Sequence, residues 1–178
     1  MQKKISSALI SVFNKDGLDD IVKLLNSHGV KIISTGGTAE FIRKLGVEVT
    51  LVEELTDYPS LFEGRVKTLH PKIAGGILKI RGNKIHEEEA LKYEIPEIDL
   101  VISNLYPFED TVTSGAGEEK IIEDIDIGGI TLIREASKNF KDVVIISSVN
   151  QYKELKEILE RRNETTLEER RKFAGAGF

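Results

Sequence analysis

The chain has 178 residues, of which 40% are hydrophobic and 31% are charged, which predicts one globular domain and excludes a disordered chain. Its formal net charge of −5 argues against a general nucleic-acid surface, because such surfaces are dominated by Lys and Arg. The absence of cysteine excludes disulfides and cysteine-ligated zinc, and no apolar run approaches the length of a membrane span.

The first third of the chain predicts alternating strands and helices. A short apolar run over residues 8–13 indicates a buried strand, and apolar residues at helical spacing after Gly17 indicate a helix. Residues 30–33 predict a second strand, the helix that follows ends at Gly46, and residues 47–52 predict a third strand. Strands joined by helices through short connections are typical of a parallel sheet covered by helices.

The rest of the chain is predicted to add two strands and several helices. The apolar runs at residues 98–105 and 143–147 predict strands, and residues 75–78 fit either a short strand or the start of a helix. The expected helices cover residues 86–93, 118–123, 131–138 and, as charged and exposed helices, 151–173. We therefore expect an α/β fold of three layers, with a mostly parallel central sheet, as a single domain over residues 1–178.

The two ends of the chain carry separate expectations. Residues 164–173 predict a charged helix with little apolar face, followed by Gly175-Ala176-Gly177-Phe178. Because such a helix usually needs another surface to pack on, we expect a further domain or a partner subunit. The first residues lack the long apolar stretch and cleavage site of a secretory signal, and we expect a cytoplasmic protein that binds no membrane.

Four polar or glycine-rich segments follow predicted strands or precede a predicted helix, at residues 14–17, 34–38, 104–108 and 126–129. In open α/β sheets, ligands bind outside the carboxyl ends of the strands. The segment Ser34-Thr35-Gly36-Gly37-Thr38 suits a phosphate, because it offers three hydroxyls, a backbone that can approach closely, and the positive end of a helix. The alternative is a tight turn in which Thr38 caps the helix.

Basic residues lie near the same predicted edge of the sheet. Lys15 follows the first strand and either supplies a cation to the phosphate or is an exposed loop lysine. The densest basic stretch runs from Gly64 to Lys72, where Arg65 and Lys67 alternate and would point to one side of an extended segment. That arrangement suits an anionic or carbonyl-bearing ligand, and the alternative is a solvated charged loop.

Two further residues are candidates for acid–base chemistry. Asp126 precedes two glycines, and Lys138 lies about three turns along the next predicted helix. Asp126 also fits a helix cap, and Lys138 also fits a solvent-exposed position, so spacing alone leaves both alternatives open. The three histidines, at positions 28, 70 and 86, lack the spacing of a metal site, and we expect no metal.

Taken in order, five segments closely resemble the IMP cyclohydrolase domain of bifunctional purine biosynthesis proteins. They are Ser-Val-Phe-Asn-Lys-Asp-Gly at 11–17, Ser-Thr-Gly-Gly-Thr-Ala at 34–39, Glu-Gly-Arg-Val-Lys-Thr-Leu-His-Pro-Lys at 63–72, Ile-Asp-Leu-Val-Ile-Ser-Asn-Leu-Tyr-Pro-Phe at 98–108 and Ile-Asp-Ile-Gly-Gly at 125–129, followed by Arg134 and Lys138-Asn139. The resemblance covers nearly the whole chain. The second segment is shared with the wider methylglyoxal-synthase-like superfamily, which implies that superfamily's fold.

The resemblance implies an enzyme of the cyclic amidine hydrolase class. Such an enzyme closes 5-formamidoimidazole-4-carboxamide ribotide (FAICAR) to IMP with loss of water, the last step of de novo purine biosynthesis. Family members usually continue into an AICAR transformylase domain that uses 10-formyltetrahydrofolate, and that domain is absent from this chain. The resemblance also implies a homodimer, and no metal or organic cofactor for the cyclohydrolase half.

The resemblance also assigns roles to individual residues. The catalytic residues would be Lys67, Tyr106, Asp126 and Lys138, and the substrate-binding residues would be Ser11, Lys15, Ser34, Gly36, Gly37, Thr38, Arg65, Thr68, Asn104, Ile127 and Gly128. Lys67 and backbone N–H groups near Ile127 and Gly128 would stabilise the formyl oxygen. The other three catalytic residues would move protons, and Asn104 and Arg65 would orient the carboxamide.

Two positions depart from the family pattern. Asp16 stands where the family usually has Thr, and Ala74 stands where many members have His. Since a carboxylate would repel a phosphate, we expect Asp16 to point away and cap the following helix.

Two other functions compete with the cyclohydrolase reading. A methylglyoxal synthase should be shorter and lack the Asn-Leu-Tyr-Pro-Phe motif. A non-catalytic nucleotide-sensing module, like that of carbamoyl-phosphate synthetase, would keep the phosphate loop and lose the four catalytic residues.

Overall fold

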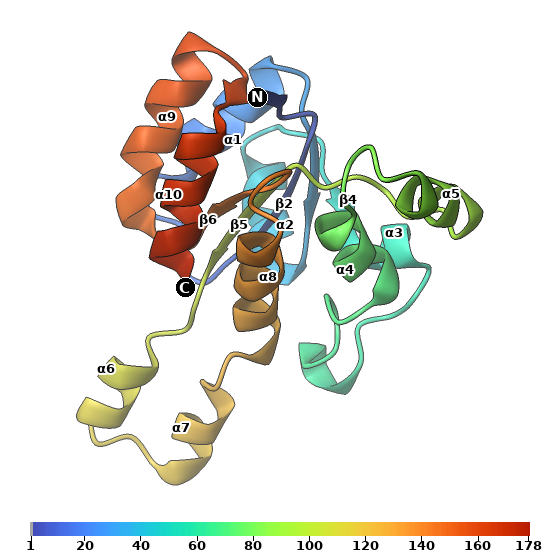
Figure 1. Ribbon diagram of the computed structural model, residues 1–178. Coiled ribbons are helices and arrows are strands. Elements are labelled where there is room, and N and C mark those ends of the chain that lie inside the picture. The colour runs from blue at the N-terminus through green and yellow to red at the C-terminus, as the bar shows by residue number, and fades with distance from the viewer. Residues whose placement is uncertain (1) are drawn as a thin grey trace.

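A computed structural model describes residues 2–178 and has a central sheet of five parallel strands in the order β4-β3-β2-β5-β6 (Figure 1). The strands are β2 (Ser7–Val12), β3 (Lys31–Ser34), β4 (Thr50–Leu51), β5 (Leu100–Asn104) and β6 (Val144–Ile146). β6 is buried along its whole length, and β2 and β5 are buried except near their carboxyl ends. Near-continuous apolar strands are expected where helices cover both faces of a parallel sheet.

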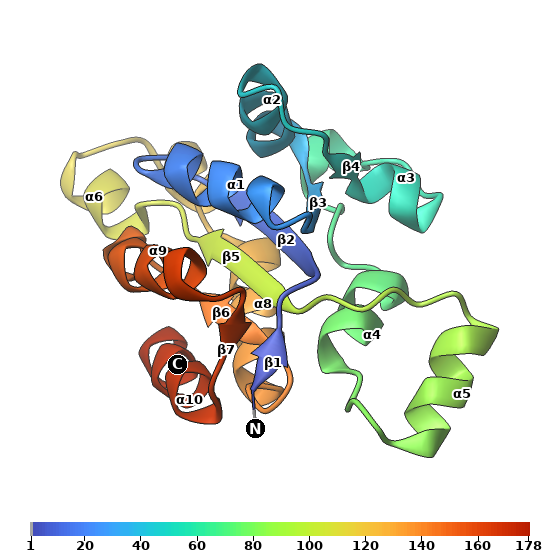
Figure 2. The same ribbon diagram turned by 90° about the horizontal axis from the view of Figure 1, so that it is seen from above.

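Helices cover both faces of this sheet (Figure 2). α1 (Leu18–Ser27) and α9 (Tyr152–Arg161) pack together on one face, while α4 (Pro71–Leu78) and α8 (Ile127–Lys138) pack together on the other. α2 (Gly36–Lys44) contacts β2 and β3, and α10 (Leu167–Gly177) lies against the edge strand β6 and α8. The predicted three-layer α/β fold is therefore confirmed.

The remaining elements are short. They are β1 (Lys3–Lys4) and β7 (Glu164–Thr165), which form an antiparallel pair, α3 (Val52–Thr56), the 3-10 turns η1 (Phe62–Gly64) and η2 (Val149–Gln151), α5 (Lys84–Lys92), α6 (Phe108–Thr113) and α7 (Glu118–Glu123). In the described residues, no helix has the length and apolar character needed to cross a membrane.

Most predicted elements lie within one or two residues of the observed ones, and three differences have a clear local cause. The third strand pairs only at Thr50–Leu51, because the chain turns at Val52 into α3. Residues 75–78 belong to α4, which starts earlier, at Pro71, a residue favoured in the first turn of a helix. α8 begins at Ile127, four residues before the predicted start, because the Asp126 side chain caps it.

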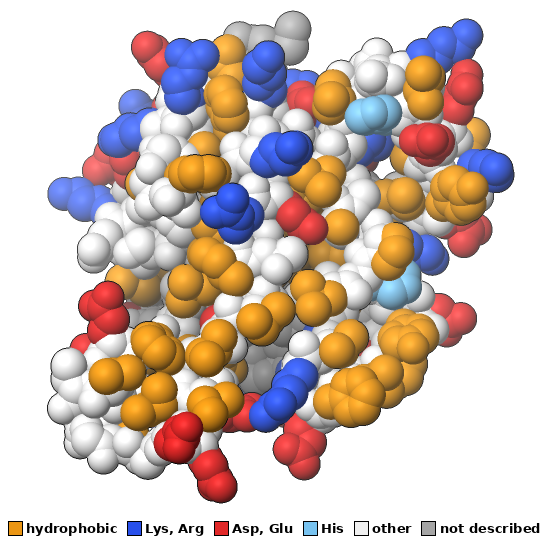
Figure 3. Space-filling model, turned by 60° about the horizontal axis from the view of Figure 1, so that its bottom comes forward, with side chains coloured by type: hydrophobic (Ala, Val, Ile, Leu, Met, Phe, Trp, Pro, Cys, Tyr) orange, Lys and Arg blue, Asp and Glu red, His pale blue; other side chains and the backbone are white. Residues whose placement is uncertain are grey.

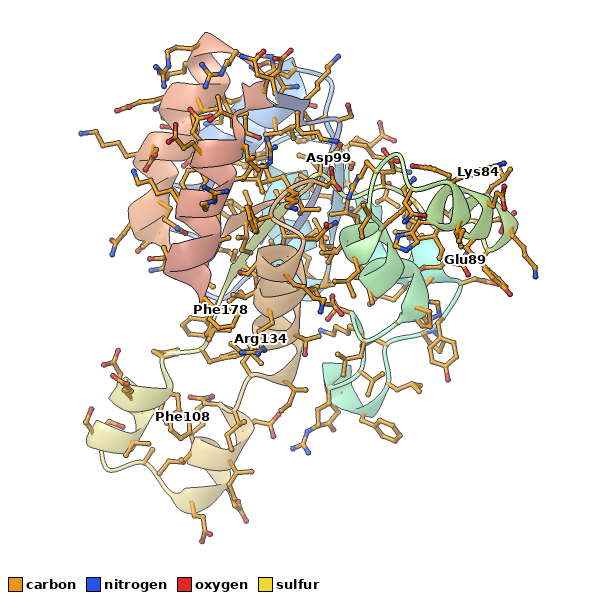
Figure 4. All side chains as sticks on the ribbon, viewed as in Figure 1. Lys84, Glu89, Asp99, Phe108, Arg134 and Phe178 are labelled. Atoms are coloured by element: carbon orange, nitrogen blue, oxygen red, sulfur yellow. The ribbon has the colours of Figure 1, made fainter. Side chains whose placement is uncertain are left out.

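The C-terminal helices pack on the chain itself, so the expectation that they are exposed and lack an internal packing surface is wrong. α9 buries Tyr152, Leu155, Ile158 and Leu159. α10 buries Phe173 and Arg170, whose guanidinium donates to the backbone carbonyls of Phe140, Lys141 and Thr165. At the end of α10, the Arg134 guanidinium lies 5.1 Å from the centre of the Phe178 ring (Figure 4).

α6 and α7 form a helical hairpin that projects from the body of the molecule at the lower left of Figure 1. Neither helix buries a residue. Hydrophobic side chains gather over this part of the surface (Figure 3), and the exposed ones on or beside the hairpin include Phe108, Val112, Ile122, Ile125, Ile127 and Ile130. We call this set the hairpin patch.

Candidate active site

A cavity of about 560 Å³ opens at the carboxyl ends of the central strands. Its walls come from residues within 11–15, 35–38, 63–68, 104–106 and 122–129. All four of the predicted strand-end and helix-start segments therefore meet at one place, together with the basic stretch. A ligand held here would touch parts of the chain that lie more than 100 residues apart.

The glycine-rich loop forms one wall of the cavity. Thr35 precedes α2 and its hydroxyl lies 3.2 Å from that of Ser11. Gly36 and Gly37 line the cavity at the first turn of α2, where backbone N–H groups have no partner within the helix. This wall therefore offers backbone donors, two hydroxyls and the positive end of a helix to an anion.

Two hydroxyls of the same loop are used inside the protein. The Ser34 hydroxyl is fully buried, donates to the Ile10 carbonyl at 2.6 Å, and does not line the cavity. The Thr38 hydroxyl donates to the Val12 carbonyl at 3.0 Å and accepts from the Val12 N–H at 3.2 Å. Both side chains tie the loop to β2, so the structure leaves neither hydroxyl free as a phosphate donor.

Asn104 holds the loop that follows β2. Its Oδ1 accepts from the backbone N–H groups of Phe13 and Asn14, at 2.8 and 2.9 Å, and its Nδ2 donates to the Asn14 carbonyl at 2.8 Å. These three bonds use Oδ1 twice and one of the two Nδ2 hydrogens, so Asn104, which lines the cavity, keeps one N–H for the carboxamide that the resemblance assigned to it. Lys15 follows this loop, lines the cavity, and donates to the Phe13 carbonyl at 3.2 Å.

The Asp16 prediction is wrong in one respect. Asp16 is exposed, but α1 is capped by Gly17, and no side chain bonds to its first turn. Instead, the Asp16 backbone N–H donates to the Asn14 side chain at 2.8 Å. The left-handed Gly17, with φ of 73°, starts the helix directly and leaves no capping position for a carboxylate.

The basic stretch forms the opposite wall of the cavity. It is not extended as predicted, because η1 and a bridge between Leu61 and Val66 fold it back on itself. Arg65 and Lys67 nevertheless both line the cavity. Arg65 forms an ion pair with Glu123 from α7, and Lys67 extends toward Gly36 in the glycine-rich loop.

Asp126 lies at the third wall, where α8 begins. Its Oδ1 accepts from the Gly129 N–H at 2.6 Å, so the residue is a helix cap and also lines the cavity. Burial raises the pKa of the Asp126 carboxyl above its usual range, and the Gly129 bond opposes this shift. A raised carboxyl pKa is typical of general acids and bases.

The remaining wall carries aromatic and small groups. The rings of Phe13 and Tyr106 lie 5.0 Å apart at an interplanar angle of 50°, and both residues line the cavity. The Thr68 hydroxyl lies against Gly128, where an added Cβ would be 3.1 Å from it. Tyr106, Thr68 and Asp126 therefore line the same cavity.

Residues 17–131 match the family model described as MGS-like domain. The chain belongs to the MGS-like domain family. Residues 136–178 match the model of the AICARFT/IMPCHase bienzyme. The crystal structure of ForH superimposes on this domain with a TM-score of 0.82 and 31% identity, covering 97% of this chain and 89% of that one.

Similarity to curated relatives supports the same family assignment. The domain is 56% identical over 177 residues to the bifunctional purine biosynthesis protein PurH of Bacteroides thetaiotaomicron, and 47% identical over 174 residues to that of Clostridium acetobutylicum. The alignments cover 99% and 98% of this chain, but 35% of each relative. The domain thus spans about a third of the length of the curated relatives it matches, and the resemblance indicated by the motifs is confirmed.

The MGS-like domain does not bring every predicted site residue to the cavity. Lys138 is exposed at the far end of α8, about 16 Å along the helix axis from Ile127, and does not line the cavity. Its neighbour Asn139 is buried and donates to the carbonyls of Ile77 and Lys79, which ties α8 to α4. Lys67, Tyr106 and Asp126 are brought together, and Lys138 is separate from them.

Sequence reasoning missed several cavity residues, Phe13 and Glu63 among them. Glu123, Ile122 and Ile125 line the cavity from α7 and the turn after it, although the sequence indicates only a helix at residues 118–123. Gly64 also lines the cavity, and its signal was its place beside Arg65 in the basic stretch. The residues from α7 and the turn after it reach the cavity because of how the hairpin folds over the edge of the sheet, and no local sequence pattern predicts that arrangement.

Proposed function

We propose that this domain is an IMP cyclohydrolase, which closes FAICAR to IMP with loss of water. The observation that carries the proposal is the meeting of an anion-binding loop, Lys67 and Asp126 around one cavity. The names of the PurH relatives support the same assignment. The reaction transfers no electrons and no group from another molecule, so we propose no metal or organic cofactor.

The ribotide phosphate would bind at the glycine-rich wall. There the backbone N–H groups of Gly36 and Gly37, the hydroxyls of Ser11 and Thr35, and the Lys15 ammonium provide donors and positive charge. Because the two reacting groups belong to one molecule, fixing their relative position can lower the barrier by about 7–11 kcal/mol. We do not assign ligand roles to the hydroxyls of Ser34 and Thr38, because β2 occupies both.

The reacting end of the substrate would lie toward Asp126. The carboxamide nitrogen forms a bond to the formyl carbon and loses one proton. The formamido nitrogen then loses its own proton as it forms the ring C=N double bond, and the formyl oxygen, which has gained two protons, leaves as water. Asp126 is placed to accept the amide proton, and Lys67 to stabilise the negative charge that develops on the formyl oxygen. Tyr106 lines the same space and is the candidate for proton delivery to the departing oxygen. We leave Lys138 out of this assignment, because it is remote from the cavity.

We also propose that the domain is cytoplasmic, works beside a covalently linked AICAR transformylase, and forms a homodimer. The bifunctional relatives are about three times as long, which supports the linked domain. The hairpin patch supports self-association, because exposed apolar clusters commonly mark interfaces. Sedimentation of the purified chain over a range of concentrations tests the dimer, and a monomer at every concentration would contradict it.

The activity is tested by supplying FAICAR and following IMP formation by absorbance. Lys67→Ala should lower kcat by about 10²-fold or more if the ammonium stabilises the transition state. Lys44→Ala, which removes an exposed lysine from the far end of α2, is the matched control and should retain full turnover. Equal turnover of both variants would remove Lys67 from the site. Turnover of dihydroxyacetone phosphate instead of FAICAR would indicate a methylglyoxal synthase. Tight IMP binding without turnover of FAICAR would indicate a non-catalytic sensing module.

A further inference from the structure

The Lys67 side chain passes between two glycines from different segments of the chain. A Cβ added to Gly64 would lie 2.5 Å from Lys67 Cε and 2.6 Å from Lys67 Nζ. A Cβ added to Gly36, across the cavity, would lie 3.2 Å from Lys67 Nζ. Contacts below 3.0 Å essentially never occur for real Cβ atoms, so the space that Lys67 occupies exists only because position 64 has no side chain.

Backbone conformation alone does not account for this arrangement. Gly64 has φ of +97°, but its neighbours Phe62 and Glu63 also have positive φ and carry full side chains. Gly82 and Gly115 have φ of +81° and +75°, and an added Cβ there would meet nothing within 4 Å. Gly64 therefore combines a left-handed backbone with a close contact to a charged side chain, and those two glycines have only the first property.

We propose that Gly64 is a positioning residue for Lys67, which fixes the ammonium between the basic stretch and the glycine-rich loop. The proposal rests on the function proposed above, in which Lys67 acts on the ribotide. The missing side chain leaves room for the end of the lysine against the Gly64 backbone and near Gly36. Position 64 thereby sets where the positive charge lies relative to the substrate.

The contact predicts how a substitution would act. The atoms that an alanine methyl at position 64 would meet are the flexible end of a lysine and not backbone, so the side chain can move away without unfolding the protein. We therefore expect the displaced lysine to lower the activity, since a displacement of about 1 Å in a catalytic group can reduce turnover by about 10²-fold. The added cost of placing alanine at positive φ is shared by any glycine of similar φ.

The experiment compares Gly64→Ala with Gly82→Ala, which has a similar φ and no neighbour to displace. Both variants should lose similar thermal stability, whereas Gly64→Ala alone should lower kcat for FAICAR closure by at least about 10-fold. In a Lys67→Ala background, Gly64→Ala should cause little further loss, because the group that it displaces is already gone. A merely structural role for Gly64 would lower activity in both backgrounds.

Four results would overturn the proposal. Gly64→Ala could match Gly82→Ala in turnover, or its loss could be undiminished in the Lys67→Ala background. If Lys67→Ala itself closed the ring at the wild-type rate, the proposed site would fail together with this inference. Should Gly64→Ala not fold, the double variant Gly64→Ala/Lys67→Ala, which removes the lysine end that the methyl group would meet, should fold again, and a double variant that also fails to fold would overturn the proposal.

Discussion

The floor of the cavity, at the carboxyl ends of the central strands, differs in its hydrogen bonding from the rim, which consists of η1, the basic stretch and the α6–α7 hairpin. On the floor, the polar side chains of Thr38 and Asn104 bond to backbone groups of β2 or the loop after it, as does the buried Ser34 beside Thr35. On the rim, η1, α6 and α7 bury no residue, and Arg65 and Lys67 line the cavity, with Arg65 in an exposed ion pair to Glu123. Polar groups of the floor therefore hold the loops in place, and those of the rim remain available to a ligand. We expect floor substitutions to lower stability and substitutions of the reacting groups to lower turnover.

The largest effect is expected at Asp126, which belongs to both classes because it caps α8 and faces the cavity. Asp126→Asn keeps a side-chain oxygen that can cap the helix but removes the base. We expect kcat to fall by about 10²-fold or more while the melting temperature stays near that of the wild type. Asp126→Ala should show the same kinetic loss and also lose about 1 kcal/mol of stability with the cap. An Asn variant with normal turnover would show that Asp126 is only a cap.

The raised pKa of Asp126 gives this comparison a pH dependence. Burial favours the protonated Asp126 carboxyl in the folded state, so protonation of this group stabilises the folded protein. This stabilisation is fully present below the pKa of an unfolded aspartate and is lost as pH rises through the folded-state pKa. Activity should change in the opposite direction, because the base must be ionised. Urea unfolding and kcat/KM measured across acidic pH should show both trends in the wild type, and Asp126→Asn should flatten them.

The second largest effect is expected at Thr38 on the floor. Thr38→Val removes a buried hydroxyl and leaves the N–H and carbonyl of Val12 without that partner, which should cost about 1–3 kcal/mol of folding free energy. Thr131→Val is the matched control, because its hydroxyl donates to the Ile127 carbonyl on an exposed helix surface. Its cost should stay within about 0.5 kcal/mol. Denaturant unfolding measures both, and equal costs would show that the floor is no more rigidly held than the surface.

The sequence predicted the floor's framework better than its chemistry. The strands near residues 8–13 and 98–105 were recognisable because they are apolar along nearly their whole length, which reflects burial on both faces. The roles of Ser34 and Thr38 were not recognisable. Which hydroxyl bonds to β2 depends on the pairing of β2 with β3, and that is a property of the folded sheet.

Helical periodicity also limits what motifs can imply. Lys138 fitted an exposed position on a helix, and the structure places it there, although the resemblance assigns it to the site. Residues 151–173 are predicted to form charged, exposed helices, yet α9 buries an apolar stripe that includes Tyr152 and Leu155. When composition is averaged over the whole segment, the many charged residues hide a narrow apolar stripe on one face of the helix.

The smallest effect is expected for the ion pair between Arg65 and Glu123 on the rim. Both side chains are more than half exposed, so Glu123→Gln should change the folding free energy by less than about 1 kcal/mol, and by less still in high salt. Glu109→Gln, on the neighbouring helix α6, serves as the control for loss of one surface charge. If Arg65 contacts the substrate without needing its ion pair to Glu123, both variants should keep turnover within about twofold of the wild type. A loss of tenfold or more in Glu123→Gln alone would mean that the hairpin aligns Arg65 for the reaction, and the rim would then be as ordered as the floor.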